Sequence, residues 1–223
     1  MTRTLGIAVI GQAPRDDIAA LFAAQAPDGT RVILRGCLDG MDDAAIAAIA
    51  PADGADTLYT RLPSGRDAII SKKAVVARAP ATLAKLREDG ADALVFNCTG
   101  AFPPMAGDAG VLFPSRVLAG LAAGLLPSGR LGLLVPLPQQ AAKLAEKWAR
   151  PGVEVVAEAL APSADDATVA AVATRLKAKA PDLIAMDCMS YTPATKDIVR
   201  RVVGAPALLG VTATARVLRE MLE

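Results

Sequence analysis

Short apolar runs alternate along the chain with longer segments in which apolar and polar residues mix at helical spacing. The apolar runs are continuous rather than alternating, which is typical of strands buried on both faces of a parallel sheet. Strands that alternate with helices indicate such sheets. The pattern predicts strands at 4–10, 31–35, 92–97, 131–135, 153–157, 182–187 and 206–209, and a hairpin at 56–70. It predicts helices at 15–25, 72–89, 115–124, 138–149, 165–179, 193–202 and 213–222, with Ser71 and Ser115 as caps.

One part of this pattern occurs twice. Asp92-Ala-Leu-Val-Phe-Asn-Cys98 and Asp182-Leu-Ile-Ala-Met-Asp-Cys188 each run from an aspartate through four apolar residues to a polar residue and a cysteine. Upstream, Leu5-Gly-Ile-Ala-Val9 matches Leu131-Gly-Leu-Leu-Val135. The repeat predicts an α/β fold of two pseudo-symmetric, Rossmann-like lobes with parallel sheets and an interlobe cleft. One continuous doubly wound sheet is the alternative.

The repeat also sets the expected domain boundaries. The first lobe is expected over residues 1–112 and the second over 113–205. The last strand and helix, within 206–223, are candidates for a return to the first lobe.

Composition and charge narrow the class of protein. The 223 residues carry 24 basic and 23 acidic side chains, a net charge of +1, and no basic stripe, which argues against a nucleic-acid partner. No apolar run approaches the roughly 18 residues of a membrane span. Three widely separated cysteines do not suggest a disulfide framework. We therefore expect a soluble, cytoplasmic protein with reduced thiols.

The chain has no histidine, and this excludes several catalytic arrangements. A Ser-His-Asp triad, a Cys-His pair and a His-rich metal site all need that side chain. A base that works near neutral pH must then be a thiolate, a carboxylate with a raised pKa or a lysine with a lowered pKa.

Cys98 and Cys188 are the candidate catalytic residues, because each follows the C-terminal end of an equivalent strand, where open α/β sheets place ligands. Backbone N–H groups at the start of a following helix would favour the thiolate. Two thiols on opposite faces of a substrate carbon suit proton abstraction by one and donation by the other. Cys37 is interpreted as a small buried residue of the core.

Polar neighbours of the two cysteines and two loops supply the candidate substrate-binding residues. In the loop after the first strand, Gly11 would let the backbone approach a ligand, and Arg15 could clamp a carboxylate or lie solvated in a first helical turn. Asp187 could bind the substrate or, by charge repulsion, hold Cys188 as a thiol. Arg116 could reach the cleft or serve the surface, and Tyr191 could line the pocket or pack the lobe. The full set is Gly11, Gln12, Arg15, Asn97, Thr99, Gly100, Arg116, Asp187, Ser190 and Tyr191.

Several of these strings resemble the AroM family over essentially the whole chain. They are Ile10-Gly-Gln-Ala-Pro-Arg-Asp16, Asp56-Thr-Leu-Tyr-Thr-Arg-Leu62, Pro114-Ser-Arg-Val-Leu118 and Asp187-Cys188. AroM proteins look related to the aspartate/glutamate/hydantoin racemase superfamily, and this resemblance implies two pseudo-symmetric lobes around a two-cysteine site.

The resemblance also bears on the two cysteines. Asn97-Cys98-Thr99 resembles the Asn-Thr context of the superfamily's first catalytic cysteine, with the order shifted. Cys188 matches the second by its place after the equivalent strand. The chain departs in Asp187-Cys188-Met189-Ser190, where the racemases usually have Thr or Gly-Thr, and it lacks the histidine that they often carry there.

Together these observations predict a cofactor-independent racemase or isomerase of a small carboxylate or related cyclic amide, with Cys98 and Cys188 as the acid/base pair. A maleate-isomerase-like or decarboxylase-like enzyme that uses one cysteine is the alternative, and a non-catalytic small-molecule-binding protein is a third possibility. We expect no cofactor and no metal. The expected partners are the small carboxylate and, in a homodimer, a second copy of the chain.

Overall fold

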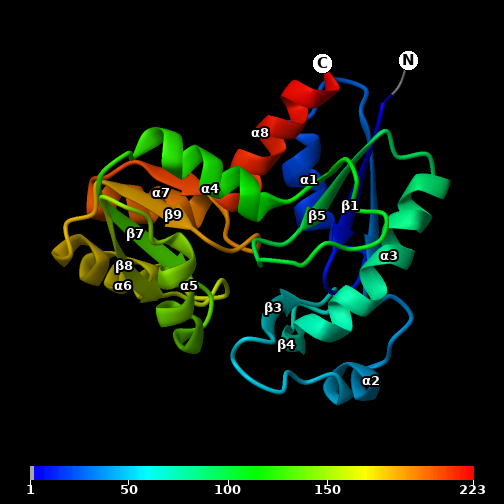
Figure 1. The fold of residues 1–223 in the computed structure, drawn as a ribbon, viewed down its shortest axis with the longest axis horizontal. Helices are drawn as coiled ribbons and strands as arrows, with labels where there is room; N and C mark the ends of the chain where they lie inside the picture. The colour runs from blue at the N-terminus through cyan, green and yellow to red at the C-terminus, as the bar shows by residue number, and fades with distance from the viewer. Residues whose placement is uncertain (1–2) are drawn as a thin grey trace. The chain divides into compact units, whose positions relative to one another are not determined.

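The predicted strands and helices form two four-stranded parallel sheets and one antiparallel hairpin in a computed structural model, which describes residues 3–223 (Figure 1). Grouping by contacts gives two compact units, one comprising the chain up to Pro114 together with Thr214–Glu223, the other Ser115–Ala213. The two separate sheets confirm the two-lobed α/β prediction and exclude a single continuous sheet.

The sheet of the first unit has the order β2-β1-β5-β6, with all neighbours parallel. Helix α3 covers one face, while α1 and the C-terminal helix α8, Gly210–Leu222, lie along the other (Figure 1). The hairpin β3–β4 and the short helix α2 lie between β2 and α3 in the sequence. The bounds are β1 Thr4–Val9, α1 Asp16–Ala23, β2 Arg31–Gly36, α2 Asp43–Ala48, β3 Thr57–Arg61, β4 Asp67–Ser71, α3 Lys72–Glu88, β5 Ala93–Asn97 and β6 Val111–Leu112.

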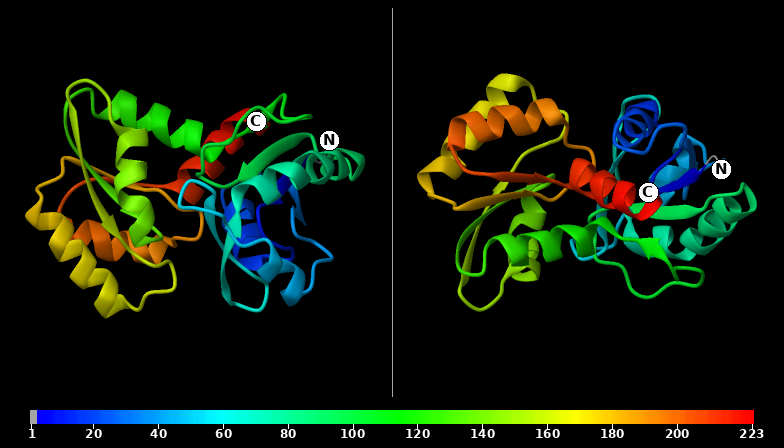
Figure 2. Two further views of the ribbon diagram at one scale, coloured as in Figure 1. Left: turned by 60° about the horizontal axis from the view of Figure 1, so that its bottom comes forward. Right: turned by 90° about the horizontal axis from the view of Figure 1, so that it is seen from above.

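The sheet of the second unit has the order β10-β9-β7-β8 and is also parallel throughout. Helices α6 and α7 lie side by side on one face, and α4 and α5 cover the other (Figure 2). The bounds are α4 Pro114–Leu125, β7 Gly129–Val135, the 3₁₀ turn Pro138–Gln140, α5 Ala141–Trp148, β8 Val153–Ala159, α6 Asp166–Ala178, β9 Leu183–Met186, α7 Pro193–Val203, β10 Ala207–Leu209 and α8 Gly210–Leu222.

The two sheets are copies of one topology. Reading β1, β2, β5 and β6 against β7, β8, β9 and β10 gives the same spatial order. The register agrees as well, because Ala8 pairs with Phe96 in the first sheet and Leu134 pairs with Met186 in the second. Phe96 and Met186 are therefore equivalent. It follows that Asn97 is equivalent to Asp187, and Cys98 to Cys188.

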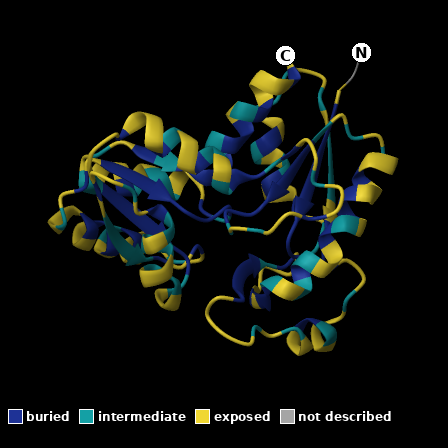
Figure 3. Cartoon of the chain, viewed as in Figure 1, coloured by how far each residue is buried: buried dark blue, intermediate teal, exposed yellow. Residues whose placement is uncertain are grey.

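Each unit has its own apolar core, as the continuous apolar strands predict. The central strands β1, β5, β7 and β9 are mostly buried, and the outer faces of the helices are exposed (Figure 3). In the first unit the core is formed by α3, the hairpin and one face of the sheet, and in the second by α4, α5 and the sheet. Leu, Val and Ile form most of it, since the chain is only 3% aromatic.

Of the two predicted helix caps, one is confirmed and one is wrong. The Ser71 side chain accepts a hydrogen bond from the Ala74 N–H and caps α3, as predicted. The predicted cap Ser115 is wrong, because α4 already begins at Pro114, which suits the first turn of a helix.

The C-terminal segment is divided between the units. Strand β10 pairs with β9, so it belongs to the second sheet, and the expected return of strand 206–209 to the first unit is wrong. The last ten residues are grouped with the first unit, where the Arg216 guanidinium reaches Gln25 just beyond α1. None of the helices within residues 3–223 has both the length and the apolar character that crossing a membrane needs.

Candidate active site: two cysteine-bearing strand ends

Cys98 lies just past β5 in the first unit and is 9% exposed. The chain turns sharply there, since the Cys98 N–H bonds back to the Phe96 carbonyl. The Gly100 N–H then donates to the Cys98 Sγ at 3.3 Å. An N–H aimed at sulfur stabilises the thiolate more than the thiol. The next helix, α4, begins only at Pro114, so the N–H that reaches this sulfur comes from a turn and not from a helix start.

Strand β3 covers the loops that follow β1 and β5. A Cβ built on Gly11 would lie 2.5 Å from the Thr60 Oγ1, and one built on Gly100 would lie 3.2 Å from Leu58. Leu58 and Thr60 are two apart, so they share one face of β3. The two glycines are thus explained by the approach of this strand.

The hairpin that carries β3 is tied down at both ends. Asp56 is buried, and burial alone would raise its pKa, but hydrogen bonds from Ser71 and from the backbone of Lys73 and Ala52 hold that pKa below the usual value. This carboxylate joins the start of β3 to the start of α3. The Asp56–Leu62 string is therefore a structural motif that fixes the cover over the strand ends.

Arg15 is buried, at 8% exposure, and its guanidinium is already occupied. Its Nε and Nη2 atoms donate to the two carboxylate oxygens of Asp17, at 2.8 and 2.6 Å, and its Nη1 donates to the Arg61 carbonyl. The hydrogen bond from Arg15 lowers the pKa of the Asp17 carboxyl. The solvated alternative is wrong, and the group that the guanidinium clamps in this structure is Asp17.

Gln12 and the rest of this loop are fixed by the turn that follows β2. The Gln12 Nε2 donates to the carbonyls of Leu38 and Met41. The Asp39 carboxylate accepts from the N–H groups of Ala13 and Gly36, both at 2.8 Å. The role of Asp39 in fixing this loop was not predicted from the sequence. The only feature of the sequence that could have indicated it is the position of Asp39 directly after Gly36-Cys-Leu38.

Cys188 lies two residues beyond β9 in the second unit and is 7% exposed. The preceding residue, Asp187, is 3% exposed, and its backbone N–H still bonds to the Leu134 carbonyl of β7. Its Oδ2 accepts from the Trp148 Nε1 at 2.7 Å and from the Lys147 Nζ at 3.2 Å. Lys147 and Trp148 are the last two residues of helix α5. The helix was predicted, but neither residue was predicted to lie at the site, although Trp148 is the only tryptophan of the chain.

One side-chain oxygen beside each cysteine is buried without a hydrogen-bond partner among residues 3–223. In the first unit it is the Asn97 Oδ1, and in the second the Asp187 Oδ1. Buried polar atoms are nearly always paired, so each exception needs a cause. Of the three such atoms among residues 3–223, the third being the Gln140 Oε1, two directly precede the candidate cysteines, which favours these strand ends as the site.

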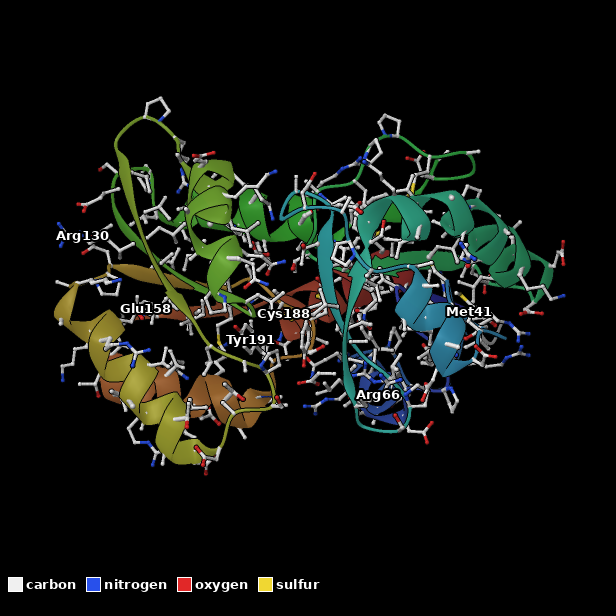
Figure 4. The ribbon with its side chains drawn as sticks, turned by 90° about the horizontal axis from the view of Figure 1, so that it is seen from below. Met41, Arg66, Arg130, Glu158, Cys188 and Tyr191 are labelled. Atoms are coloured by element: carbon white, nitrogen blue, oxygen red, sulfur yellow. The ribbon has the colours of Figure 1, made fainter. Side chains whose placement is uncertain are left out.

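The remaining predicted residues have varied surroundings. Tyr191 is fully buried and its hydroxyl donates to the Leu160 carbonyl just past β8, which favours the packing alternative. Figure 4 marks Cys188 and Tyr191 on the segment after β9. Thr99 is buried, Ser190 is half-buried in a turn, and Arg116 is exposed in the first turn of α4.

Cys37 belongs to the apolar core of the first unit, and burial raises the pKa of its thiol to about 12. The thiol therefore stays neutral near pH 7, which suits the predicted structural role. Within residues 3–223, no three cysteine or acidic side chains gather to form a metal site.

Two parallel sheets of the same strand order form a fold that several solved structures share. Unliganded arylmalonate decarboxylase aligns with 99% of this chain and 92% of its own at 16% identity and a TM-score of 0.62. Maleate isomerase from Pseudomonas putida S16 aligns over 99% and 92% at 12% identity and 0.64. Glutamate racemase from Francisella tularensis, in complex with D-glutamate, aligns over 99% and 81% at 15% and 0.60. At these identities the likeness is one of fold.

The particular family follows from the sequence itself. The profile described as AroM protein matches residues 5–222, so the chain belongs to the AroM family. No curated protein matches the chain at a significant level.

Proposed function

We propose that the protein is a cofactor-independent racemase or isomerase that moves the proton on the carbon next to a carboxylate. The observation that carries the proposal is the equivalence of Cys98 and Cys188, which follow the same register position in two copies of one sheet. Two of the three cysteines of the chain occupy these equivalent positions.

In the proposed reaction one thiolate removes the α-proton, and the electron pair of the C–H bond moves into the adjacent carboxylate. The other thiol then gives its proton to the opposite face of the carbon, so that the roles of the two sulfurs are exchanged after each turnover. The chemistry requires one substrate within reach of both sulfurs. The N–H bond from Gly100 supports Cys98 as the cysteine that holds the thiolate at rest.

The proposed substrate-binding residues are neighbours of the two cysteines in the sequence, residues of the loop after β1, and Arg116 at the start of α4. Asn97 and Asp187 each have one buried side-chain oxygen without a hydrogen-bond partner among residues 3–223. Gly11, Thr99, Gly100 and Ser190 offer backbone or hydroxyl groups, and Gln12 and Arg15 shape the first loop. Arg116 remains a proposed surface or site residue, and Tyr191 is proposed to support the segment that carries Cys188.

Solvent exchange tests the proposal. Purified protein in D2O is incubated with both enantiomers of aspartate and glutamate, with a substituted hydantoin, and with phenylmalonate and maleate. Deuterium entering the α-carbon, followed by proton NMR, is the expected result. Replacing both Cys98 and Cys188 by alanine should abolish it, whereas Cys37→Ala is the matched control and should retain it. Exchange that survives the double replacement would refute the proposal.

A second candidate is a one-cysteine enzyme of the maleate-isomerase or decarboxylase kind. The unequal neighbours of the two cysteines favour it, because Cys98 receives the Gly100 N–H, whereas a carboxylate directly precedes Cys188. A solved maleate cis-trans isomerase from Nocardia farcinica, with 17% identity and a TM-score of 0.60, carries a covalently bound succinylcysteine intermediate. A covalent adduct on Cys98 alone, detected by mass spectrometry after incubation with maleate, would favour this candidate. Tight binding with neither exchange nor adduct would indicate a non-catalytic binding protein.

A further inference from the structure

The N–H group that reaches the Cys98 sulfur comes from a segment without regular secondary structure. Residues 98–110, between β5 and β6, contain neither helix nor strand. Within this segment the Gly100 N–H donates to the Cys98 Sγ at 3.3 Å. A hydrogen bond weakens steeply when its donor moves or tilts, and here neither a strand ladder nor a helical turn fixes the donor. Another contact must therefore hold Gly100 in place.

Phe102, two residues beyond Gly100, fastens this segment to the strand that presents Cys98. The Phe102 and Phe96 rings meet edge to face, with their centroids 4.9 Å apart and their planes at 79°, a favoured geometry for aromatic pairs. Phe96 lies on β5 and is fully buried, so its ring is a fixed partner. The Phe113 ring adds a further contact, with its centroid 6.5 Å from that of Phe102. The chain that leaves Cys98 is thus folded back onto β5.

The same ring fills the space beside Gly100. A Cβ built on Gly100 would lie 3.2 Å from the Phe102 Cε2 and 3.2 Å from the Leu58 Cδ2. Gly100 does not have a positive φ, so its backbone conformation alone does not require glycine. The glycine is explained by the two side chains that close on it, one from β3 and one from position 102. They leave its backbone, including the N–H group, little room to move.

We propose that Phe102 is a positioning residue for Cys98, because its packing on Phe96 and against Gly100 holds the Gly100 N–H on the sulfur. An N–H held there stabilises the thiolate over the thiol, so Phe102 raises the fraction of Cys98 that is ready to remove a proton. Phe102 is not among the predicted site residues, and it acts through the backbone of the turn. The catalytic consequence rests on the proposed function, whereas the effect on the thiol does not.

Loss of the Phe102 ring has two opposite effects on the pKa of the Cys98 thiol. Without the held N–H the thiolate loses a donor, which raises that pKa. The space left by the ring admits water to the turn, and better hydration of a thiolate lowers its pKa. A rise therefore reports the loss of the donor. If Phe102 only filled space, its removal would leave the pKa unchanged or lower it.

Alkylation of the purified protein tests the proposal without any substrate. Iodoacetamide is added at pH values from about 5 to 10, and mass spectrometry follows the peptide that contains Cys98, so that the other two cysteines do not interfere. Because the thiolate is the form that reacts, the midpoint of the alkylation rate against pH gives the pKa. Phe102→Ala should raise this midpoint by about 0.5 to 1, which lowers the thiolate fraction near pH 7 by about threefold to tenfold.

Two further variants provide a rescue and a control. Phe102→Tyr keeps the ring and its edge-to-face contact, so its midpoint should stay within about 0.2 of the wild-type value. Phe22→Leu is the matched control, because Phe22 is 1% exposed in α1 and lies outside the core cluster that contains Cys98. It should lower the free energy of unfolding, measured with denaturant, but leave the midpoint of Cys98 alkylation unchanged.

Each result supports or overturns the proposal. An unchanged or lower midpoint in Phe102→Ala would overturn it, as would an equal rise in Phe102→Tyr or in Phe22→Leu. If Phe102→Ala fails to fold, Phe102→Leu takes its place, since leucine keeps much of the volume but lacks the ring edge, and the expected direction is the same.

The outcomes also separate this inference from the proposed function. A raised midpoint in Phe102→Ala, in a protein that shows no α-proton exchange with any acid, would keep the positioning role and refute the proposed function alone. Exchange that needs both cysteines, with an unchanged midpoint in Phe102→Ala, would keep the proposed function and refute the positioning role. Where both hold, the acidic limb of the pH profile for exchange should move upward with the alkylation midpoint.

Discussion

The strand end before Cys98 and the strand end before Cys188 share one register, yet a neutral side chain precedes the first cysteine and a charged one the second. Asn97 needs no counter-ion. Asp187 is held by the last two residues of α5, which supply an indole N–H and an ammonium. Both keep one buried oxygen without a donor among residues 3–223.

The helices that follow the first strand of each repeat use their charges differently. In the first unit, Arg15 and Asp17 pair with each other at the start of α1, and Arg15 also binds the hairpin through the Arg61 carbonyl. In the second unit, the charge at the end of α5 is directed at the strand end itself. The two sheets thus keep their cysteines at equivalent positions, although their surroundings differ. In the first unit the charged side chains of the helix hold the loop and the hairpin, whereas in the second the charged side chain of the helix binds the residue before the cysteine.

Single replacement of each cysteine is the strongest test of this comparison. Cys98→Ser and Cys188→Ser should each lower racemisation by about a hundredfold to ten-thousandfold, the range for loss of one acid/base group. Because each sulfur serves one face, the residual α-proton exchange should favour opposite enantiomers in the two variants, as measured by NMR in D2O. Loss of the same enantiomer in both would contradict two-sided chemistry.

Exchanging the preceding residues tests the charge difference. Asn97→Asp should destabilise the protein by about 3 kcal/mol, because it buries a carboxylate whose site already leaves one oxygen without a donor among residues 3–223. Asp187→Asn should cost less, about 1 to 2 kcal/mol, because an amide oxygen can still accept from Trp148. Denaturant unfolding of both variants measures the difference, and equal losses would show that the two strand ends tolerate charge alike.

The cover over the first strand end offers a third test. Gly11→Ala should cost about 1 to 3 kcal/mol, because the new methyl group meets the Thr60 Oγ1 at 2.5 Å. Adding Thr60→Ala removes the two nearest atoms and should restore most of the loss. Gly120→Ala in α4, where nothing among the described residues lies within 4 Å, is the control and should stabilise by about 0.5 to 1 kcal/mol. If Gly11→Ala leaves the free energy of unfolding unchanged, the contact between β3 and the loop after β1 is not as close as described.

The smallest effect is expected from the third cysteine. Burial raises the Cys37 pKa from 9.0 to about 12, so the unfolded chain releases this proton first as the pH rises. The stability from the neutral thiol is fully present below pH 9 and should fall by about 1 kcal/mol or more between pH 9 and 12. Cys37→Ala should show a shallower decline in that window, measured by denaturant unfolding at several pH values. Identical slopes would contradict the assignment.

The apolar pattern was sufficient to predict nearly every long element, because buried parallel strands and amphipathic helices have distinct periods. It missed α2, a six-residue Ala-rich helix, and β6, which has only two residues, since neither is long enough to show a period. The repeat also located both cysteines, because equivalent strands carry equivalent C-terminal ends.

The surroundings of those cysteines could not be predicted, because they depend on contacts between distant residues. Arg15 is followed by Asp17 in the sequence, but its bond to the Arg61 carbonyl needs the hairpin in place. Lys147 lies 40 positions from Asp187 and resembles any surface lysine of a helix. Local patterns predict elements, whereas the identity of a partner depends on how those elements pack.

The Asp39 carboxylate, which binds the N–H groups of Ala13 and Gly36, has a practical consequence for anyone who wishes to transplant the Gly-Gln-Ala-Pro-Arg loop. Grafted alone onto another α/β scaffold, the five residues would lose the carboxylate that fixes their backbone and the carbonyl that anchors their arginine. A portable version must include the turn after β2 and the hairpin. The conformation of this loop thus depends on three segments together: the loop itself, the turn after β2 and the hairpin. The presence of the short string in another protein would therefore not be enough to predict the same loop conformation.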